Sequence, residues 1–517
     1  MATVSEKLAQ SLSILKGLQD SGKIAIRSRD MTRTHRERLL KNGFLQEVMK
    51  GWYIHVRPDE TPGESTAWYA SFWGFAADYL HARFEDTWCL SPEQSLALHT
   101  GNWAVPRQLL VRSPKGGNKP TTLLHNTSIF DLRLELPQEE DIEILDGLRV
   151  MRLSVALITC PPSYFTTAPL ELRSALSMIS DPSSLLRPLL EGSHSKIAGR
   201  LAGAFRNIGR ASIADTILET MKAAGHTVYE SDPFAEPSRI AFGKREVSPY
   251  VNRLRILWAG FRQNIIEHFP KAPGFPKAAE EKQRFLERMD QLYTTDAYHS
   301  LSIEGYRVSP DLIECVRTGD WNPDNVKEDH EQRNALAARG YWQAFQALKT
   351  TVTDVLNGKD AGEAAEDDYQ TWYRELFGPS VVAGIISPID LAGFRNRPVY
   401  IRRSMHTPPK AEALIDLMPT FFELLQQEES MEVRVVLGHF IFVYIHPFID
   451  GNGRTGRFLM NLMLAAGGYH WLVIPVEKRN DYMQALESAS VDQDIVPFTK
   501  FLADLLLSEG EIYRDRL

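Results

Sequence analysis

The residues best suited to bind a ligand or to catalyse a reaction lie in one short turn. This turn lies between the two apolar halves of VVLGHFIFVYIHPFIDGNGRTGRFLMNLMLAAGG. Polar groups this dense between two buried segments are costly unless a ligand satisfies them. The turn therefore predicts a binding site. Its glycine, charged and polar residues are His446, Asp450, Gly451, Asn452, Gly453, Arg454 and Arg457.

Each of these residue types suits part of a nucleotide site. Gly451–Gly453 permit unusual backbone angles, so N–H groups at a helix N-terminus can point at a phosphate. Arg454 and Arg457 are three apart, hence on one side of that helix, and suit two more phosphates. Asp450 suits a Mg²⁺ that bridges phosphate oxygens, and His446 can take a proton near neutral pH. The pattern predicts a Mg²⁺–nucleotide site with a positioned base.

Two helices must hold this turn. Val435–Ile445 is predicted to be a buried helix that ends before Pro447, because the residue preceding a proline is pushed out of the α region. The segment RTGRFLMNLMLAA is predicted to be a second apolar helix, closed by Gly467–Gly468. We interpret His439, on the first helix, as an ordinary core histidine.

The segment HPFIDGNGRTGR matches, at every specified position, the motif HxFx(D/E)GNGRxxR of the Fic (filamentation induced by cAMP) family. The resemblance extends over about residues 250–510. It implies the all-helical Fic fold. It also implies transfer of a nucleotide monophosphate, usually AMP from ATP, to a Ser, Thr or Tyr hydroxyl of a target protein.

The same resemblance implies a role for each residue of the motif. His446 would be the base that deprotonates the target hydroxyl. Phe448 would anchor the turn in the core, and Asp450 would hold Mg²⁺. The remaining residues would bind ATP, with the α- and β-phosphates at Asn452, Gly453 and Arg454 and the γ-phosphate at Arg457.

A β-like run, Val399, Tyr400 and Ile401, lies where the family has its target flap. A flap could hold an extended target segment by strand addition, with backbone hydrogen bonds supplying affinity. Arg402, Arg403 and His406 would then bias the choice of target. An ordinary surface hairpin is the alternative interpretation.

The downstream segment VIPVEKRNDYMQALESAS resembles the family's nucleoside pocket. Tyr482 matches an aromatic position there. Ser490 stands where some relatives have an adenine-contacting Asn, so the base preference stays open.

The segment SLSIEG fits the family's inhibitory motif (S/T)xxxE(G/N). Ser300 and Glu304 are four apart, hence on one helix face, and Gly305 can end that helix. In the family this glutamate pairs with the last arginine of the catalytic motif, here Arg457, and blocks productive binding of the γ-phosphate. An ordinary exposed glutamate is the alternative.

The first 60 residues predict a small module of two helices followed by a hairpin, the pattern of a winged helix. RTHRERLLKNGFLQEVMKGWYIHV and CLSPEQSLALHTGNW resemble the winged-helix domain of abortive-infection type IV antitoxins, over roughly residues 5–160. Lys23–Arg57 holds nine Lys/Arg and three Asp/Glu, which would suit duplex DNA phosphates. The candidate DNA contacts are Arg33, Arg36 and Arg38, and a solvated helix face is the alternative.

Composition excludes several classes of protein. The chain has 517 residues, 43% of them apolar and 24% charged, with 58 Lys/Arg and 66 Asp/Glu for a net charge of −8. These values are ordinary for a globular chain and argue against a DNA binder that is basic throughout. The three dispersed cysteines fit neither a disulfide framework nor a zinc site, and a cytoplasmic location is expected. Neither a membrane span nor a secretory signal is expected.

The predicted fold is mainly α, with an all-helical Fic domain at residues 250–517 that begins with the inhibitory helix. The preceding parts are a winged-helix-like module (1–60), a mixed α+β then helical region (61–230) and a linker (231–249). The predicted function is that of an autoinhibited protein adenylyltransferase. The alternatives are a DNA-binding regulator or antitoxin-like protein that uses the Fic site as a nucleotide sensor, and a Fic enzyme that uses another donor or removes AMP.

Overall fold

The structure is a computed structural model that describes residues 3–58, 64–235, 248–275, 278–320 and 329–514. It divides into two compact units. Unit 1 comprises Met1–Arg253 and Tyr400–Thr407, and unit 2 comprises Leu254–Val399 and Pro408–Leu517. Most of the expected linker, residues 236–247, lies outside the described residues.

The N-terminal part of unit 1 is a module of helices and a three-stranded antiparallel sheet with the order β1-β3-β2. Its core is formed by buried apolar side chains that include Leu15, Leu39 and Tyr53. The expected helix and hairpin are present, and the hairpin turns at Gly51, whose φ is 83°. The elements are α1 (Val4–Asp20), β1 (Ile26–Arg27), α2 (Arg33–Lys41), β2 (Leu45–Met49) and β3 (Trp52–His55).

The middle of unit 1 contains a four-stranded mixed sheet with the order β4-β5-β7-β6, in which β5 and β7 are parallel. A separate hairpin pairs β8 with β9, and its turn residues Asp146 and Gly147 both have positive φ, as a type I′ turn requires. The elements are α3 (Thr66–Phe84), β4 (Cys89–Leu90), α4 (Pro92–His99), β5 (Gln108–Ser113), β6 (Pro120–Thr122), β7 (Ser128–Arg133), β8 (Ile142–Leu145) and β9 (Leu148–Met151).

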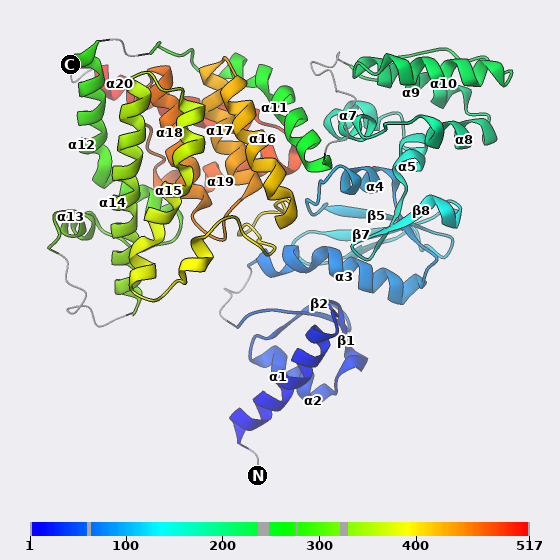
Figure 1. Cartoon of the computed structure of the whole chain (residues 1–517). Coiled ribbons are helices and arrows are strands. Elements are labelled where there is room, and N and C mark those ends of the chain that lie inside the picture. The colour runs from blue at the N-terminus through cyan, green and yellow to red at the C-terminus, as the bar shows by residue number, and fades with distance from the viewer. Residues whose placement is uncertain (1–2, 59–63, 236–247, 276–277, 321–328, 515–517) are drawn as a thin grey trace. The chain divides into compact units, whose positions relative to one another are not determined.

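The rest of unit 1 is helical, as the sequence predicts for residues 165–230 (Figure 1). Its apolar faces meet in one core cluster that includes Leu176, Leu201 and Ile217. The helices are α5 (Leu153–Thr159), α6 (Tyr164–Thr167), α7 (Pro169–Ser177), α8 (Ser183–Glu191), α9 (Ser195–Asn207) and α10 (Ala211–Ala223).

The predicted flap is not a strand, so that part of the prediction is wrong. Residues 399–401 form neither helix nor strand. Val, Tyr and Ile favour a pleated surface, but a strand also needs a neighbouring edge, and none of the described strand pairs includes this run. The run leads into a turn at Arg403, whose φ is 61°.

Tyr400–Thr407, expected within the C-terminal domain, is instead part of unit 1. Arg402 forms a salt bridge with Glu64, with 2.6 Å between Nη2 and Oε2. The backbone N–H of Arg403 donates to Thr66 Oγ1 at 3.2 Å. Arg402 and Arg403, which were expected to bias the choice of target, therefore bond to Glu64 and Thr66 of unit 1.

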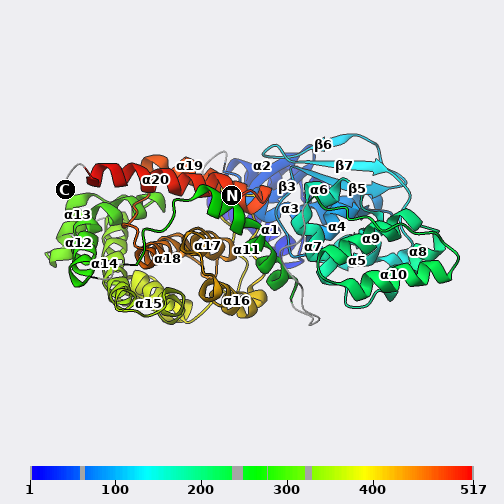
Figure 2. The same ribbon diagram turned by 90° about the horizontal axis from the view of Figure 1, so that it is seen from above.

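Unit 2 is built from helices, which confirms the predicted fold class. Figure 2 shows α17 and α18 side by side among the other helices of the unit. Both are almost entirely buried, as the sequence predicts, and the polar side chains of α18 lie mostly in its first two turns. The helices are α11 (Pro249–His268, in unit 2 from Leu254 on), α12 (Ala279–Ile303), α13 (Pro310–Thr318), α14 (Asp329–Leu356), α15 (Ala361–Val382), α16 (Leu414–Gln427), α17 (Met431–Ile445), α18 (Asn452–Gly467), α19 (Arg479–Glu487) and α20 (Val496–Arg514).

Among the described helices, none combines the length and the apolar character needed to cross a membrane.

The three arginines proposed as DNA contacts differ in their surroundings. Arg33 is exposed and pairs with Glu37 on the same helix. Arg36 donates to the carbonyl of Ser28 and lies over the Tyr53 ring. Arg38 donates to the carbonyl of Lys7 and to Ser11 Oγ, each at 2.8 Å. Two of the three candidates therefore hold α2 against the rest of the module.

This difference predicts unequal effects on stability. Arg38→Ala removes two hydrogen bonds from a charged donor and should weaken the α1–α2 contact by about 1 kcal/mol. Amide hydrogen exchange of α1 in the full-length chain should then be faster. Arg33→Ala is the matched control on the same helix and should leave that exchange unchanged, since an exposed pair contributes little. Equal effects of both changes would contradict the assigned contacts.

Candidate active site

The turn between α17 and α18 depends on two residues with left-handed backbone conformations. His446 ends α17 with a φ of 54°, and its N–H still donates to the carbonyl of Phe442 at 3.0 Å. Gly451 precedes α18 with a φ of 82°. A Cβ at Gly451 would lie 2.8 Å from the Phe377 ring, so only glycine fits there. The first backbone N–H groups of α18 are thereby held at the turn.

The side chain of Asn452 staples the turn. Its Oδ1 accepts from the Phe448 N–H and its Nδ2 donates to the Phe448 carbonyl, both at 2.9 Å. The Phe448 ring is buried and stacks on Tyr373, with ring centroids 3.7 Å apart. Both polar atoms of the side chain therefore serve the turn, and the predicted role of Asn452 at the phosphates stays a prediction.

The imidazole of His446 is oriented by the end of its own helix. Nδ1 lies 3.1 Å from the carbonyl of Val443, and since a carbonyl only accepts, Nδ1 carries the proton and Nε2 keeps its lone pair. The pKa of His446 is lowered to about 4, chiefly by burial and also by Arg395, while Val443, Glu304 and Asp450 act in the opposite direction. Above that pH the ring is neutral and Nε2 can accept a proton.

Arg454 is a buried cation with unused donors. Its guanidinium carbon lies 5.3 Å from the centroid of the Tyr306 ring and 4.9 Å from that of the Phe377 ring. Nη2 is 3.4 Å from Asp450 Oδ1, whereas Nε and Nη1 are buried and find no hydrogen-bond partner among the described residues. Buried charged donors without partners are costly, and a bound anion such as phosphate would satisfy them.

The Asp450 carboxylate lies at the open edge of this cradle. Its side chain is 56% exposed, and Oδ1 accepts from the Gly451 N–H at 2.6 Å. Within the described residues no group of three or more His, Cys, Asp or Glu side chains could hold a metal ion. Mg²⁺ in nucleotide sites commonly uses one or two carboxylates together with phosphates, so the single Asp450 beside an anion cradle fits that ion.

Arg457, in contrast, has partners from α12. Its Nη2 donates to Glu304 Oε1 at 2.7 Å, and its Nε donates to Ser300 Oγ at 2.8 Å. Nη2 also reaches the Ser300 carbonyl at 3.1 Å. The carboxylate packs closely on Gly453, since a Cβ there would lie 2.3 Å from Glu304 Oε1. Gly305 ends the helical segment with a φ of 91°.

The helix end that carries Glu304 is itself fixed. Arg479 Nε donates to the carbonyl of Ile303 at 2.7 Å, and the Val476 N–H donates to His299 Nδ1 at 3.1 Å. The last turn of α12 is thus held against the segment that begins α19.

Tyr482 is placed in the core rather than on a surface that could stack on a nucleobase. Its hydroxyl is 2.7 Å from Nε2 of His439, and both side chains are buried. His439 is therefore the core histidine that the sequence predicts. In the described conformation, Tyr482 offers no exposed ring face to a ligand.

Sequence reasoning missed three residues that shape the site. Tyr306 and Phe377 cover the Arg454 guanidinium, and Arg395 contacts the backbone of the catalytic turn. Tyr306 directly follows the inhibitory motif, so its position was a usable signal. Phe377 and Arg395 lie 69 and 51 residues before His446, outside any motif, and only the fold brings them there.

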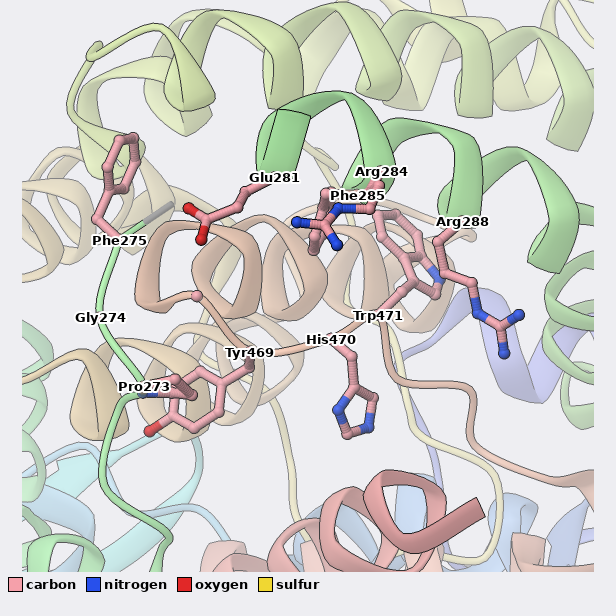
Figure 3. A pocket seen from close by; sticks show the side chains of 11 residues that line it. Pro273, Gly274, Phe275, Glu281, Arg284, Phe285, Arg288, Tyr469, His470 and Trp471 are labelled. Carbon is pink, nitrogen blue, oxygen red and sulfur yellow. The ribbon is translucent and has the colours of Figure 1, made fainter. Parts of the chain in front are cut away.

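A separate pocket of about 730 Å³ lies at the other end of α12 (Figure 3). Its lining includes Phe275, Phe285, Arg288, Tyr469 and Trp471. None of the predicted site residues lines it, so it is not part of the candidate site.

Residues 364–464 match the sequence profile of the Fic/DOC family. The predicted resemblance to the Fic family is confirmed over these residues, and the match includes α17, the turn and α18 up to Leu464. The predicted domain bounds, 250–517, stay a prediction. It does not include the first 363 residues, so the winged-helix resemblance stays a prediction.

Among known proteins, the chain is 40% identical over 233 residues to protein adenylyltransferase Fic of Drosophila willistoni, which is 43% of this chain and 42% of that protein. The protein of the same name from Drosophila grimshawi is 40% identical over 231 residues, 43% of each chain. The chain thus spans less than half the length of these relatives.

Solved structures with some likeness include Fic-1 (residues 134–508) from C. elegans and a Fic family protein from Desulfovibrio desulfuricans G20. The first has a TM-score of 0.38 and 18% identity, over 68% of this chain and 98% of that one. The second has a TM-score of 0.37 and 20% identity, over 53% of this chain and 77% of that one.

The staple at Asn452 gives a prediction about stability. Asn452→Ala should leave the buried N–H and carbonyl of Phe448 without partners, at about 1–3 kcal/mol for each group. The midpoint of urea unfolding, followed by tryptophan fluorescence, should fall accordingly. Asn334→Ala is the control, because its partner, the N–H of Arg307, is exposed to water and should tolerate the change. Similar midpoints for both variants would contradict the staple.

Proposed function

We propose that the chain is a protein adenylyltransferase that transfers AMP from ATP to a hydroxyl group of a target protein. The observation that carries this proposal is the pairing, in one turn, of a neutral His446 with the unsatisfied buried donors of Arg454. Neutral His446 suits removal of a proton, and the Arg454 donors suit binding of a phosphate. The Fic family match and the relatives named adenylyltransferase support the same activity.

The chemistry divides among the residues of the turn. Nε2 of His446 takes the proton of the target hydroxyl as its oxygen attacks the α-phosphorus. The new P–O bond replaces the bond to the β-phosphate, and pyrophosphate leaves. The N–H groups at the start of α18 and the Arg454 guanidinium hold the phosphates and stabilise the developing charge. Asp450 is the residue that would hold Mg²⁺, which when bound supplies further charge neutralisation at the phosphates.

The base has a direct test. His446→Ala should leave Mg·ATP binding nearly unchanged, because Arg454 and the turn N–H groups remain, while AMP transfer falls by roughly 10²–10⁴-fold. Calorimetry measures the binding, and labelling of lysate proteins with α-³²P-ATP measures the transfer. His81→Ala, at an exposed histidine of unit 1, is the control. Normal transfer by His446→Ala would overturn the mechanism, and labelling with GTP or CTP but not ATP would correct the donor.

We propose further that Glu304 inhibits this activity. Its carboxylate pairs with Arg457 beside Gly453, where the γ-phosphate is expected. Charge-assisted pairs of this kind contribute about 1.5–3 kcal/mol, which corresponds to roughly 10- to 150-fold in nucleotide engagement. Nucleotide and carboxylate would then compete for one guanidinium.

Inhibition by Glu304 predicts a gain of activity. Glu304→Gly should raise labelling by roughly 10- to 150-fold, whereas Glu304→Gln should raise it less, since an amide can still accept from the guanidinium. The double variant Glu304→Gly, Arg457→Ala should lose most of the gain, because both changes act through one contact. Equal labelling by the unchanged chain and Glu304→Gly, with a genuine target present, would refute inhibition while leaving the role of His446 intact.

Two further proposals rest on composition. Duplex DNA binding by the N-terminal module is supported by the basic balance of Lys23–Arg57 and by the exposed position of Arg33. A cytoplasmic location is supported by three dispersed cysteines that form no disulfide among the described residues.

A further inference from the structure

Arg395 makes an unusual set of contacts for a buried arginine. It lies outside any helix or strand, and its side chain is almost completely buried. Its hydrogen bonds within the described residues all end on backbone carbonyl oxygens, with no carboxylate among the acceptors. Burial lowers its pKa to about 10, so it stays a cation at neutral pH. A buried cation needs strong compensation, and here the carbonyls supply it.

One group of these carbonyls belongs to the end of α17. Nε of Arg395 donates to the carbonyl of His446 at 2.8 Å, and Nη2 reaches that of Ile445 at 3.4 Å. The backbone N–H of Arg395 also donates to the carbonyl of Pro447 at 2.9 Å. The last carbonyls of a helix lack partners within the helix, and a cation is favoured there. Arg395 therefore caps α17 at the residue that carries the base.

The other carbonyls belong to the loop between Arg395 and α16. Nη1 donates to the carbonyl of Arg397 at 3.3 Å, and Nη2 donates to that of Pro409. These two residues stand on the outgoing and returning limbs of the loop that contains the expected flap residues Val399, Tyr400 and Ile401. A single guanidinium thus joins both limbs of this loop to the main chain of His446.

We propose that Arg395 is a positioning residue for AMP transfer, which holds Arg397, Pro409 and the His446 main chain in one fixed relation. The inference rests on the proposed function, since it assumes that a target hydroxyl is presented to His446. The ring of His446 is directed by a left-handed backbone, and Arg395 bonds to the carbonyl of that residue. Misplacement of a catalytic group by about 1 Å can cost 10²-fold in rate.

The proposal is tested in the full-length Glu304→Gly variant, so that inhibition does not mask the rate. Arg395→Lys keeps the charge, but one ammonium group cannot span carbonyls on both segments. AMP transfer to protein hydroxyls should fall about 10²-fold, with the dissociation constant for Mg·ATP changed less than about twofold. Arg374→Lys is the control, an exposed arginine on α15 that bonds only within its own helix. A full rescue by Lys, or an equal loss of nucleotide affinity, would overturn the proposal.

A second readout does not depend on catalysis. Amide hydrogen exchange should rise in Arg395→Lys for both residues 396–409 and 443–450, and in neither for Arg374→Lys. Unchanged exchange in either segment would refute the shared clamp even if transfer falls. If the Glu304→Gly parent transfers no AMP, the proposed function fails, while the exchange data still decide whether Arg395 joins the two segments.

Discussion

The structure of the site depends on how α17 ends. His446 leaves the helix in a left-handed conformation that a side-chain-bearing residue adopts at a cost, and three contacts maintain it. Its N–H stays on Phe442, its ring bonds to Val443, and its carbonyl receives Arg395. Because α18 begins six residues later, the same geometry decides where the first N–H groups of α18 point. The ring of His446 and the first N–H groups of α18 are thus both positioned by one helix terminus.

Three buried arginines surround this terminus, and each is compensated in a different way. Arg395 is bound by carbonyls, and Arg457 is bound by Ser300 and Glu304. Arg454 has two aromatic rings near its guanidinium and two donors without partners among the described residues. Desolvation is costly for all three cations. The least satisfied of them is therefore the place where an anionic ligand gains most, and the pair at Arg457 is the place where a ligand must displace a resident carboxylate.

The sequence predicted the apolar helices and the turn, because these follow from hydropathy and from a dense motif. The approach of Glu304 to Arg457 was implied by the resemblance to the Fic family. The sequence did not predict the use of Asn452, since an amide in a glycine-rich turn suits a ligand and a backbone staple equally well. The strand predicted at Val399–Ile401 is not present. Strand propensity describes how well a side chain fits a sheet, whereas a strand also needs the edge of another strand to pair with. Arg395 carried no local signal at all, since its acceptors are backbone carbonyls that any residue could supply.

The contact around Arg457 involves more than one glutamate. Asp296 and Ser300 are four apart and share one face of α12, and Glu304 follows as the C-cap of that helix. Ser300 bonds Arg457 through both its hydroxyl and its carbonyl, and Asp296 accepts from Tyr341 at 3.0 Å. Loss of the Glu304 carboxylate alone would leave the Ser300 bonds in place, so Arg457 would stay oriented and become available to a phosphate. Displacement of the whole helix end would instead release Arg457 from all of these partners. Removing the Glu304 carboxylate therefore takes away the counter-charge of Arg457, while Ser300 still orients the Arg457 side chain.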